Sequence, residues 1–302
     1  MFEQARQELS TLRDLLRFSV SRFNEAGLFF GHGSDNAWDE AAYLLLHALH
    51  LPPERLEPFL DARLTSDERR AALRIIERRI NERLPAAYLT NEAWLGEHRF
   101  YVDQRVIVPR SFIAELLREQ LAPWIDDPWA VSRVLDLCTG SGALAIALAL
   151  GSPGSRVVAV DDDPAALAYA RRNAATTAVR IVAGDVTDPD LLPDLVGTVD
   201  LVVANPPYIP AGVELQPEVA QHDPAHALFG GPDGMAVIGP IVRRAADWLR
   251  AGGLLAVEHD DTTSDATVET IRCTGAFVEV AAHRDLTGRP RFVTARAGRE
   301  MR

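Results

Sequence analysis

Apolar residues recur at helical intervals in the first part of the chain, and this spacing predicts one amphipathic helix over residues 2–23. The positions of this apolar stripe are Leu9, Leu12, Leu15, Leu16 and Val20. Asp35 or Asn36 is expected to cap a second helix. Thr65 and Glu68 have the spacing of a capping box and predict the start of a third helix, which Pro85 ends.

Residues 88–109 are richer in aromatic and β-branched side chains. Gly96 and Glu97 separate two short runs of this kind, so the pattern predicts a β-hairpin or a two-stranded bridge. A helix over residues 111–121 and a proline-bounded loop over 123–128 are expected to follow.

From Arg133 onward, short apolar strands alternate with helices. The predicted strands are 133–137, 156–160, 179–182, 199–204, 253–258, 276–281 and 291–296. The predicted helices are 142–150, 164–174, 234–250 and 263–273. This alternation predicts an α/β fold with a doubly wound, mostly parallel sheet. No helix separates the last two strands, so the final strand should be antiparallel.

The composition narrows the classes of protein. There are 43 acidic and 31 basic residues, giving a net charge of −12, which disfavours a free-standing binder of duplex DNA. Two cysteines, Cys138 and Cys273, cannot build a disulfide framework or a zinc knuckle. The polar N-terminus does not resemble a signal peptide, and no apolar run reaches the roughly 18 residues of a membrane span. A cytoplasmic protein is therefore expected.

The first candidate motif runs from Asp136 through Cys138, Thr139, Gly140, Ser141 and Gly142, where an apolar strand meets a helix. Glycines in such a turn allow a ligand to approach the backbone amides. The motif is not a full G-x-G-x-x-G, which disfavours NAD. Asp136 would repel a pyrophosphate but would favour the sulfonium and amino groups of S-adenosylmethionine. A turn that serves only tight packing is the alternative.

Two further acidic positions fit a nucleoside. Asp161 ends the second strand, about 20 residues after the glycines, where a carboxylate binds ribose hydroxyls. Asp185 and Val186 follow the third strand, where they could meet the amine and the ring of adenine. A solvated loop acid at Asp161 and a plain turn at Asp185 remain alternatives.

The fourth motif, Asn205-Pro206-Pro207-Tyr208, directly follows the apolar strand 201–204. The prolines make the turn rigid. The Asn205 side-chain oxygen and the Pro206 carbonyl can each accept one proton of a planar NH2 group, on which Tyr208 can stack. Positioning and electrostatics would then activate a weakly nucleophilic amide or aminopurine nitrogen for methyl transfer. No metal is required.

Other candidates are weaker. His222, His226 and His259 lack a convincing metal-ligand spacing, so surface or hydrogen-bonded histidines are the preferred interpretation. An arginine stripe with interleaved glutamates lies on the third predicted helix, between Arg69 and Arg83. A solvated face of ion pairs is preferred there over a contact with ribosomal RNA or an acidic partner.

Together, residues 136–142 and the Asn-Pro-Pro-Tyr tetrapeptide resemble the protein-(glutamine-N5) methyltransferases, the HemK-like branch of the class I S-adenosylmethionine-dependent enzymes. Pro109-Arg110-Ser111 before the glycine motif makes the resemblance more specific. Residues 1 to about 150 are similar to the type that acts on ribosomal protein L-three, as in Trp38-Asp39-Glu40-Ala41. Residues from about 151 are similar to the release-factor type, as in His222-Asp223-Pro224.

The resemblance implies a helical substrate-recognition domain over residues 1–85, a hairpin linker over 86–110 and a seven-stranded methyltransferase domain over 111–302. It implies that residues 138–142, Asp161, Val186 and Asn205 contact S-adenosylmethionine, and that Asn205, Pro206, Pro207 and Tyr208 meet the substrate glutamine. Many members have Gly at position 138 and an aromatic residue at 186. Ribosomal protein L-three is the preferred substrate, because the recognition domain resembles that type.

Other functions remain open at this point. A peptide chain release factor is the alternative substrate. A nucleic-acid adenine-N6 methyltransferase could use the same tetrapeptide, but it would need a basic path for phosphates, which the net charge disfavours. A ribosome-assembly module that only binds the cofactor is the non-catalytic alternative.

Overall fold

The computed structural model describes residues 1–114, 130–285 and 287–298. These residues form two compact units. The helical unit consists of Met1–Ala93, Val102–Gln104 and Leu215–His222; the sheet unit consists of Trp94–Tyr101, Arg105–Glu214 and Asp223–Arg302. The domain boundaries expected at residues 85 and 110 stay predictions.

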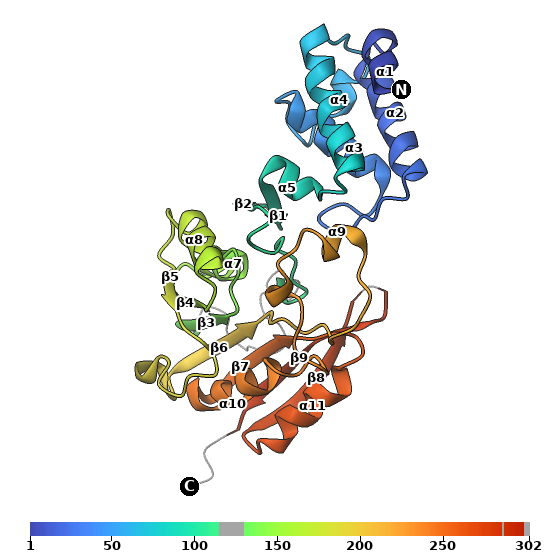
Figure 1. Ribbon diagram of the computed structural model, residues 1–302. Helices are drawn as coiled ribbons and strands as arrows, with labels where there is room; N and C mark the ends of the chain where they lie inside the picture. Colours follow the sequence, from blue (N-terminus) through green and yellow to red (C-terminus); the bar gives the residue numbers. More distant parts are fainter. Residues whose placement is uncertain (115–129, 286, 299–302) are drawn as a thin grey trace. The chain divides into compact units, whose positions relative to one another are not determined.

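The helical unit contains six α-helices among its described residues (Figure 1). They are α1 (Phe2–Glu8), α2 (Leu12–Glu25), α3 (Ala37–Ala48), α4 (Ser66–Asn81), α5 (Ala86–Thr90) and the short α9 (Pro217–Ala220); a 3-10 turn, η1, spans Glu57–Phe59. The single helix predicted over residues 2–23 is wrong. The Thr11 side chain accepts from Asp14 N and the Asp14 carboxylate accepts from Thr11 N, so a capping box starts a new helix there.

The caps expected for the next two long helices are confirmed. The Asn36 side chain accepts from Asp39 N at the start of α3. Thr65 and Glu68 form the predicted capping box of α4. Residues 88–90, however, belong to α5 rather than to an extended segment, because Pro85 fixes the backbone at the N-terminus of that helix.

The arginine stripe on α4 is only partly a solvated face. Arg70 pairs with Asp67, and Arg78 pairs with Glu82, on the exposed side. Arg79 is fully buried, contrary to the expectation, and its Nε lies 2.6 Å from the buried Glu40 carboxylate. Its helical position turns Arg79 inward, where the charge is balanced by buried carboxylates.

The expected hairpin is present. Strand β1 (Glu92–Leu95) pairs with β2 (His98–Tyr101), and Gly96 between them adopts a left-handed φ of 61°. At the end of β2, the Asn173 side chain holds both backbone groups of Tyr101, since Nδ2 donates to the carbonyl and Oδ1 accepts from the N–H.

The seven-stranded sheet confirms the predicted fold class. Its strands are β3 (Arg133–Leu137), β4 (Arg156–Asp161), β5 (Arg180–Ala183), β6 (Val199–Ala204), β7 (Leu249–Glu258), β8 (Phe277–Arg284) and β9 (Pro290–Ala297). Their order is β5-β4-β3-β6-β7-β9-β8. Only β9 runs antiparallel to its neighbours, as the missing crossover helix predicts.

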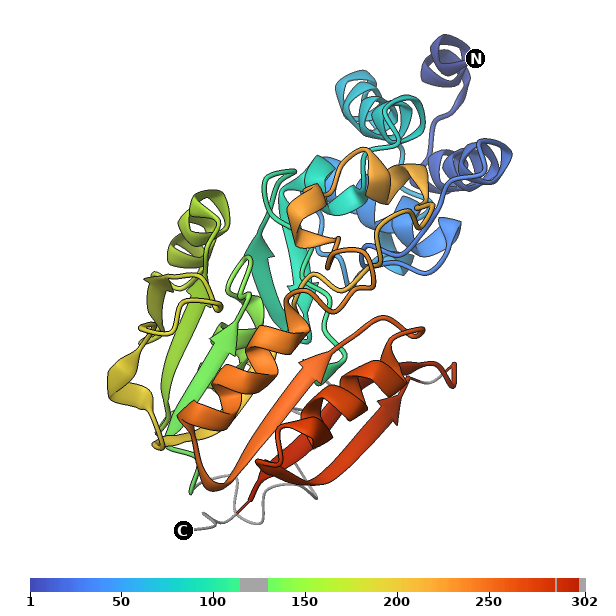
Figure 2. The same ribbon diagram turned by 60° about the horizontal axis from the view of Figure 1, so that its bottom comes forward.

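Helices cover both faces of this sheet (Figure 2). Alternate strand residues form two cores, one with α7 (Ala143–Gly151) and one with α10 (Ile238–Trp248) and α11 (Ser264–Cys273). The helix α8 (Pro164–Asn173) follows β4. Helix α10 starts four residues later than predicted, because Gly234 adopts a left-handed φ of 78° that a right-handed helix cannot contain.

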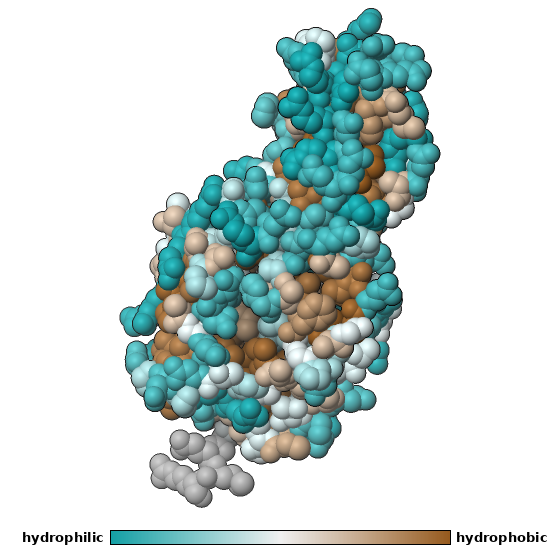
Figure 3. Space-filling model, in the orientation of Figure 1, coloured by the Kyte–Doolittle hydropathy of each residue, from teal (hydrophilic) through white to brown (hydrophobic). Residues whose placement is uncertain are grey.

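The helix expected over residues 111–121 lies mostly outside the described residues, as does the loop over 123–128. Among the described residues, no helix is long and apolar enough to cross a membrane. In Figure 3, hydrophilic residues dominate the visible face of helices α1 and α4, while the apolar side chains of these helices fill the interior of the helical unit.

Candidate active site

The predicted motifs all follow carboxyl ends of parallel strands in the sheet unit. The glycine turn follows β3, Asp161 ends β4, Asp185 follows β5, and Asn205 follows β6. The register places Leu137 beside Val160 and Ala204, so the motifs of β3, β4 and β6 meet at one edge. Ligands of doubly wound folds bind at this edge, next to the point where the strand order reverses.

The turn over residues 138–142 is left-handed at three positions. Cys138 has a φ of 57°, Gly140 of 56° and Gly142 of 80°. A non-glycine residue in this conformation is strained, and such strain persists where the surroundings hold the backbone for a purpose. A Cβ at Gly142 would lie 3.2 Å from Ala170 Cα, so this glycine also permits close packing of α7 on α8.

Two carboxylates, the buried Asp136 and the partly buried Asp161, hold the turn by hydrogen bonds. Asp136 Oδ2 accepts from Thr139 Oγ1 at 2.5 Å and from Ala145 N at 3.1 Å. Asp161 Oδ2 accepts from Gly140 N at 2.8 Å, and its Oδ1 accepts from Asp163 N. Burial raises the pKa of Asp136 to about 7 and also raises that of Asp161. The turn is therefore rigid before any ligand arrives.

The electrostatic surroundings of the turn are negative. Burial, followed by the charges of Asp161, Asp136 and Asp162, raises the pKa of the Cys138 thiol well above its ordinary value. Asp185 adds a further negative charge at this position. Carboxylates gathered around a backbone turn favour a cationic ligand and oppose a pyrophosphate.

Asp185 and Val186 differ in their exposure to solvent. The Asp185 side chain is exposed and accepts from Thr187 N at 2.7 Å, which lowers its pKa. Val186 is buried and belongs to the core of the sheet unit. Asp185 therefore forms a hydrogen bond that stabilises a turn, and Val186 packs in the core of the sheet unit.

The tetrapeptide begins where β6 ends, with Asn205 partly exposed and Pro206 buried. Asn205 Nδ2 donates to the Arg110 carbonyl at 2.9 Å. This bond directs the Nδ2 end of the carboxamide to the protein and leaves Oδ1 as a free acceptor. No described residue donates to Asn205 Oδ1 or to the Pro206 carbonyl. The acceptor oxygens of two consecutive residues therefore remain available for a ligand with two N–H groups.

A glycine-rich segment outside the predicted site residues supports the tetrapeptide. Ile209 N donates to Leu228 O, and Gly230 N donates to Ile209 O. A Cβ at Gly230 would lie 2.5 Å from Pro207 O, and one at Gly234 would lie 2.3 Å from Tyr208 O. Only glycine permits this backbone approach. The run of Gly230, Gly231 and Gly234 was the available signal in the sequence.

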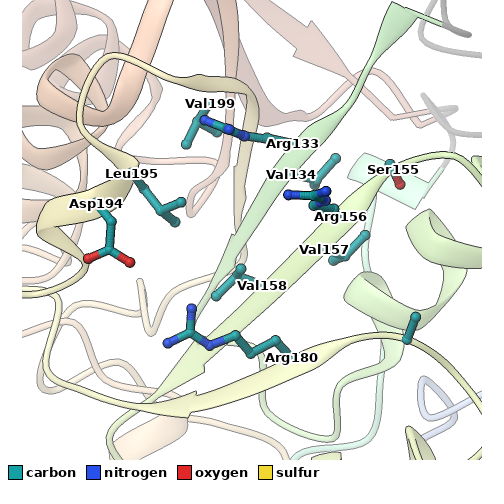
Figure 4. Close-up of a pocket in the computed structure, with 11 residues that line it drawn as sticks. Arg133, Val134, Ser155, Arg156, Val157, Val158, Arg180, Asp194, Leu195 and Val199 are labelled. Carbon is teal, nitrogen blue, oxygen red and sulfur yellow. The ribbon is translucent and has the colours of Figure 1, made fainter.

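A pocket of about 420 Å³ lies at the opposite edge of the sheet (Figure 4). Its lining includes the first residues of four strands, which are Arg133, Arg156, Arg180 and Val199. In Figure 4, the side chain of Arg180 extends from β5 into the open space between β4 and the segment that carries Asp194. Because the motifs follow the carboxyl ends of the strands, this pocket is separate from the candidate active site.

The three candidate histidines form hydrogen bonds within their own units. In the helical unit, His222 contacts Gln104 and the Glu82 carbonyl with its two ring nitrogens. In the sheet unit, His226 contacts Asp163, and the buried His259 contacts the Asp260 carbonyl. In the described ranges, no group of three or more His, Cys, Asp or Glu side chains could hold a metal ion.

The sheet order, the glycine turn and the tetrapeptide define a methyltransferase. The family model described as "Methyltransferase small domain" matches residues 114–228. The ribosomal protein uL3 glutamine methyltransferase of Bordetella pertussis is 54% identical over 256 residues, covering 84% of this chain and 85% of its own.

Enzymes named for release factors are also similar. The release factor glutamine methyltransferase of Mycolicibacterium smegmatis is 58% identical over 221 residues, covering 71% of this chain and 75% of its own. That of Mycobacterium tuberculosis is 46% identical over 290 residues, covering 94% and 91%. The chain belongs to the HemK-like family of protein glutamine methyltransferases.

Proposed function

We propose that this protein transfers a methyl group from S-adenosylmethionine to the side-chain amide nitrogen of a glutamine in a translation protein, with ribosomal protein uL3 as the preferred substrate. The observation that carries the proposal is the pair of unused acceptors on Asn205 and Pro206. A primary amide has two N–H donors in one plane, which two adjacent oxygens can hold together. A cytoplasmic location is part of the same proposal.

The acidic edge of the sheet suits the cofactor. Asp136, Asp161 and Asp185 all act on the Cys138 position, which favours the sulfonium and amino groups of S-adenosylmethionine over phosphates. Asp161 would hold the ribose, residues 138–142 would face the amino-acid part, and Val186 would pack near the adenine beside Asp185. When bound, S-adenosylmethionine supplies the electrophilic methyl group.

The residues of the tetrapeptide would orient the acceptor. Asn205 Oδ1 and the Pro206 carbonyl would accept the two amide protons, which raises electron density on nitrogen and fixes its direction of attack. Pro207 makes the turn rigid, and Tyr208 offers its ring to the amide plane. Burial raises the pKa of Tyr208, so its phenol stays protonated at physiological pH.

The preferred substrate is uL3 because the N-terminal part of the chain resembles that type and the uL3 enzyme from Bordetella pertussis is 54% identical over 84% of this chain. The release-factor enzyme from Mycobacterium tuberculosis covers 94% at the lower identity of 46%, and that from Mycolicibacterium smegmatis covers 71%. A release factor is the second candidate, since that enzyme is 58% identical. The helical domain predicted over residues 1–85 is proposed to select the substrate. Swapping it together with Leu215–His222, which belongs to the same compact unit, for the corresponding segments of a release-factor enzyme would then shift preference without abolishing turnover.

The test compares purified uL3 and a peptide chain release factor side by side with cofactor that carries a labelled methyl group. Mass spectrometry should place the label on a glutamine side chain. The Asn205→Ala variant should lose about 10²–10³-fold in turnover, because one positioned hydrogen-bond group is removed. Methylation of adenine in nucleic acid, with neither protein modified, would overturn the proposal.

A further inference from the structure

Glu258 is a buried carboxylate at the carboxyl end of β7 that the proposed chemistry does not use. Its side chain is 1% exposed. The carboxylate Oε1 accepts from Ser111 Oγ at 2.5 Å and from Ile113 N at 3.1 Å, and the Phe112 backbone also bonds to it. A carboxylate is costly to bury unless several donors satisfy it. Here all three donors belong to one short turn.

That turn directly follows the carbonyl that orients Asn205. Arg110 is covalently joined to Ser111, and the Arg110 carbonyl accepts from Asn205 Nδ2 at 2.9 Å. The Arg110 carbonyl orients the Asn205 carboxamide. Glu258 fixes the residues that immediately follow Arg110. The guanidinium carbons of Arg110 and Arg291 lie 5.7 Å and 5.1 Å from the centroid of the Phe112 ring, so cation–π contacts also support this turn.

The sheet places Asn205 beside Glu258. Strands β6 and β7 are parallel neighbours, and Ala204 is in register with Val257. Asn205 and Glu258 are the residues that directly follow the two members of this pair in the sequence. The turn 110–113 bridges them, although it precedes both by more than 90 residues in the sequence. In the sequence, Glu258 therefore stands only in the run Glu258-His259-Asp260-Asp261 at a strand end, which fits an acidic cluster at a cleft rim or a solvated turn and gives no sign of this connection.

We propose that Glu258 is a positioning residue for methyl transfer, which holds the turn Arg110–Ile113 so that Asn205 presents Oδ1 to the substrate amide. This inference rests on the proposed function. Glu258 does not touch the substrate. It acts through the Arg110 carbonyl, so its removal should impair the chemical step more than the binding of either ligand.

The test measures kcat, KM for the protein substrate and the affinity for S-adenosylmethionine in four variants. Glu258→Ala should lower kcat about 10–100-fold, with KM and cofactor affinity within about threefold of wild type. Glu258→Gln keeps an acceptor oxygen and should retain kcat within about fivefold. Ser111→Ala should give an intermediate loss. Glu279→Ala removes an exposed glutamate of β8, paired with Arg296, and should leave kcat unchanged.

A double mutant separates positioning from a general structural effect. If Glu258 acts through Asn205, Glu258→Ala should lower kcat by less than about threefold when Asn205 is already Ala. A full additional loss in that background would overturn the proposal, as would a single Glu258→Ala variant within threefold of wild-type kcat. If Glu258→Ala does not fold, the same cycle with Ser111→Ala decides the question.

A measurement without turnover keeps this inference distinct from the proposed function. In protein labelled with ¹⁵N-asparagine, hydrogen exchange of the Asn205 side-chain amide should accelerate at least tenfold in Glu258→Ala or Ser111→Ala. The proposal stands on that result even if no glutamine is methylated. Unchanged exchange in both folded variants would overturn it, whatever the substrate proves to be.

Discussion

Replacing Gly234 by Ala should displace the tetrapeptide, because the new methyl group meets the backbone of Tyr208. The added Cβ would lie 2.3 Å from the Tyr208 carbonyl oxygen and 3.3 Å from Thr263 Cγ2. Ordinary van der Waals contact requires roughly 1 Å more, and a backbone carbonyl cannot rotate away as a flexible side chain can. The Tyr208 backbone must therefore move by about that distance.

The expected cost has two parts. The φ of 78° at Gly234 is left-handed, and placing Ala there destabilises the fold by about 1–2 kcal/mol. A displacement of about 1 Å in a positioning group can lower turnover about a hundredfold. The variant should thus show a modest fall in melting temperature and a large fall in kcat.

Alanine variants at two other glycines separate the effect of backbone strain from that of the collision. Gly212 lies in the same loop with a φ of 89°, and a Cβ added there would meet nothing within 4 Å, so Gly212→Ala carries the backbone strain without the collision. Gly154 has neither feature, and Gly154→Ala should leave both measurements unchanged. Methyl transfer at saturating cofactor and thermal unfolding are measured in parallel. A kcat of Gly234→Ala within threefold of that of Gly212→Ala would refute the argument.

Three further outcomes are expected. The pKa of Glu258 is raised to about 7 in the folded protein, against 4.5 for the unfolded group, so folding favours its protonated form. The free energy of unfolding should fall by up to about 3 kcal/mol as the pH rises from below 4.5 through 7, and Glu258→Gln should flatten this slope in urea titrations; an unchanged slope contradicts the assignment. Asp161→Ala should weaken S-adenosylmethionine binding by about 1–3 kcal/mol in calorimetry, whereas Asp194→Ala at the opposite edge should not, and equal affinities would exclude Asp161 as the ribose ligand. Glu218→Ala should destabilise the helical unit by about 3–5 kcal/mol, because it breaks the buried ion pairs of Glu218 with Arg79 and Arg83. As a control, loss of the exposed Asp61, which pairs with Arg13, should cost less than about 1 kcal/mol. Similar denaturation midpoints for the two variants would be inconsistent with a stabilising role of the buried pairs.

The order and type of the sheet elements could be predicted because each strand and helix carries its own apolar pattern. The strand 199–204 and the start of α8 at Pro164 match their predicted positions. The break at Thr11 was missed although the signal is local, since Asp14 stands where a capping box more often has Glu or Gln. The apolar stripe continues across the break and hides it.

The candidate site likewise combines a local motif with residues whose roles depend on distant partners. Asn205 and its prolines form a local motif that the sequence displays directly. The Arg110 carbonyl that orients Asn205 lies 95 residues away, and the Glu258 carboxylate lies 147 residues from Ser111. Glu218 looks like an ordinary surface acid in the sequence, yet it is fully buried. Such roles arise only when the fold brings distant segments together, so no periodicity or spacing can reveal them.

The segment Leu215–His222 has a consequence for how members of this family can exchange parts. It lies far along the chain, yet it belongs to the helical unit, where the Glu218 carboxylate accepts from Phe29 N at 3.0 Å and pairs with Arg83 at 2.8 Å. A gene fragment that encodes only residues 1–93 would leave those groups, and the buried Arg79, without this acceptor. Recombination at one crossover point would separate the partners. A working chimaera that inherits a new helical unit must therefore inherit two separate stretches of sequence from the same parent.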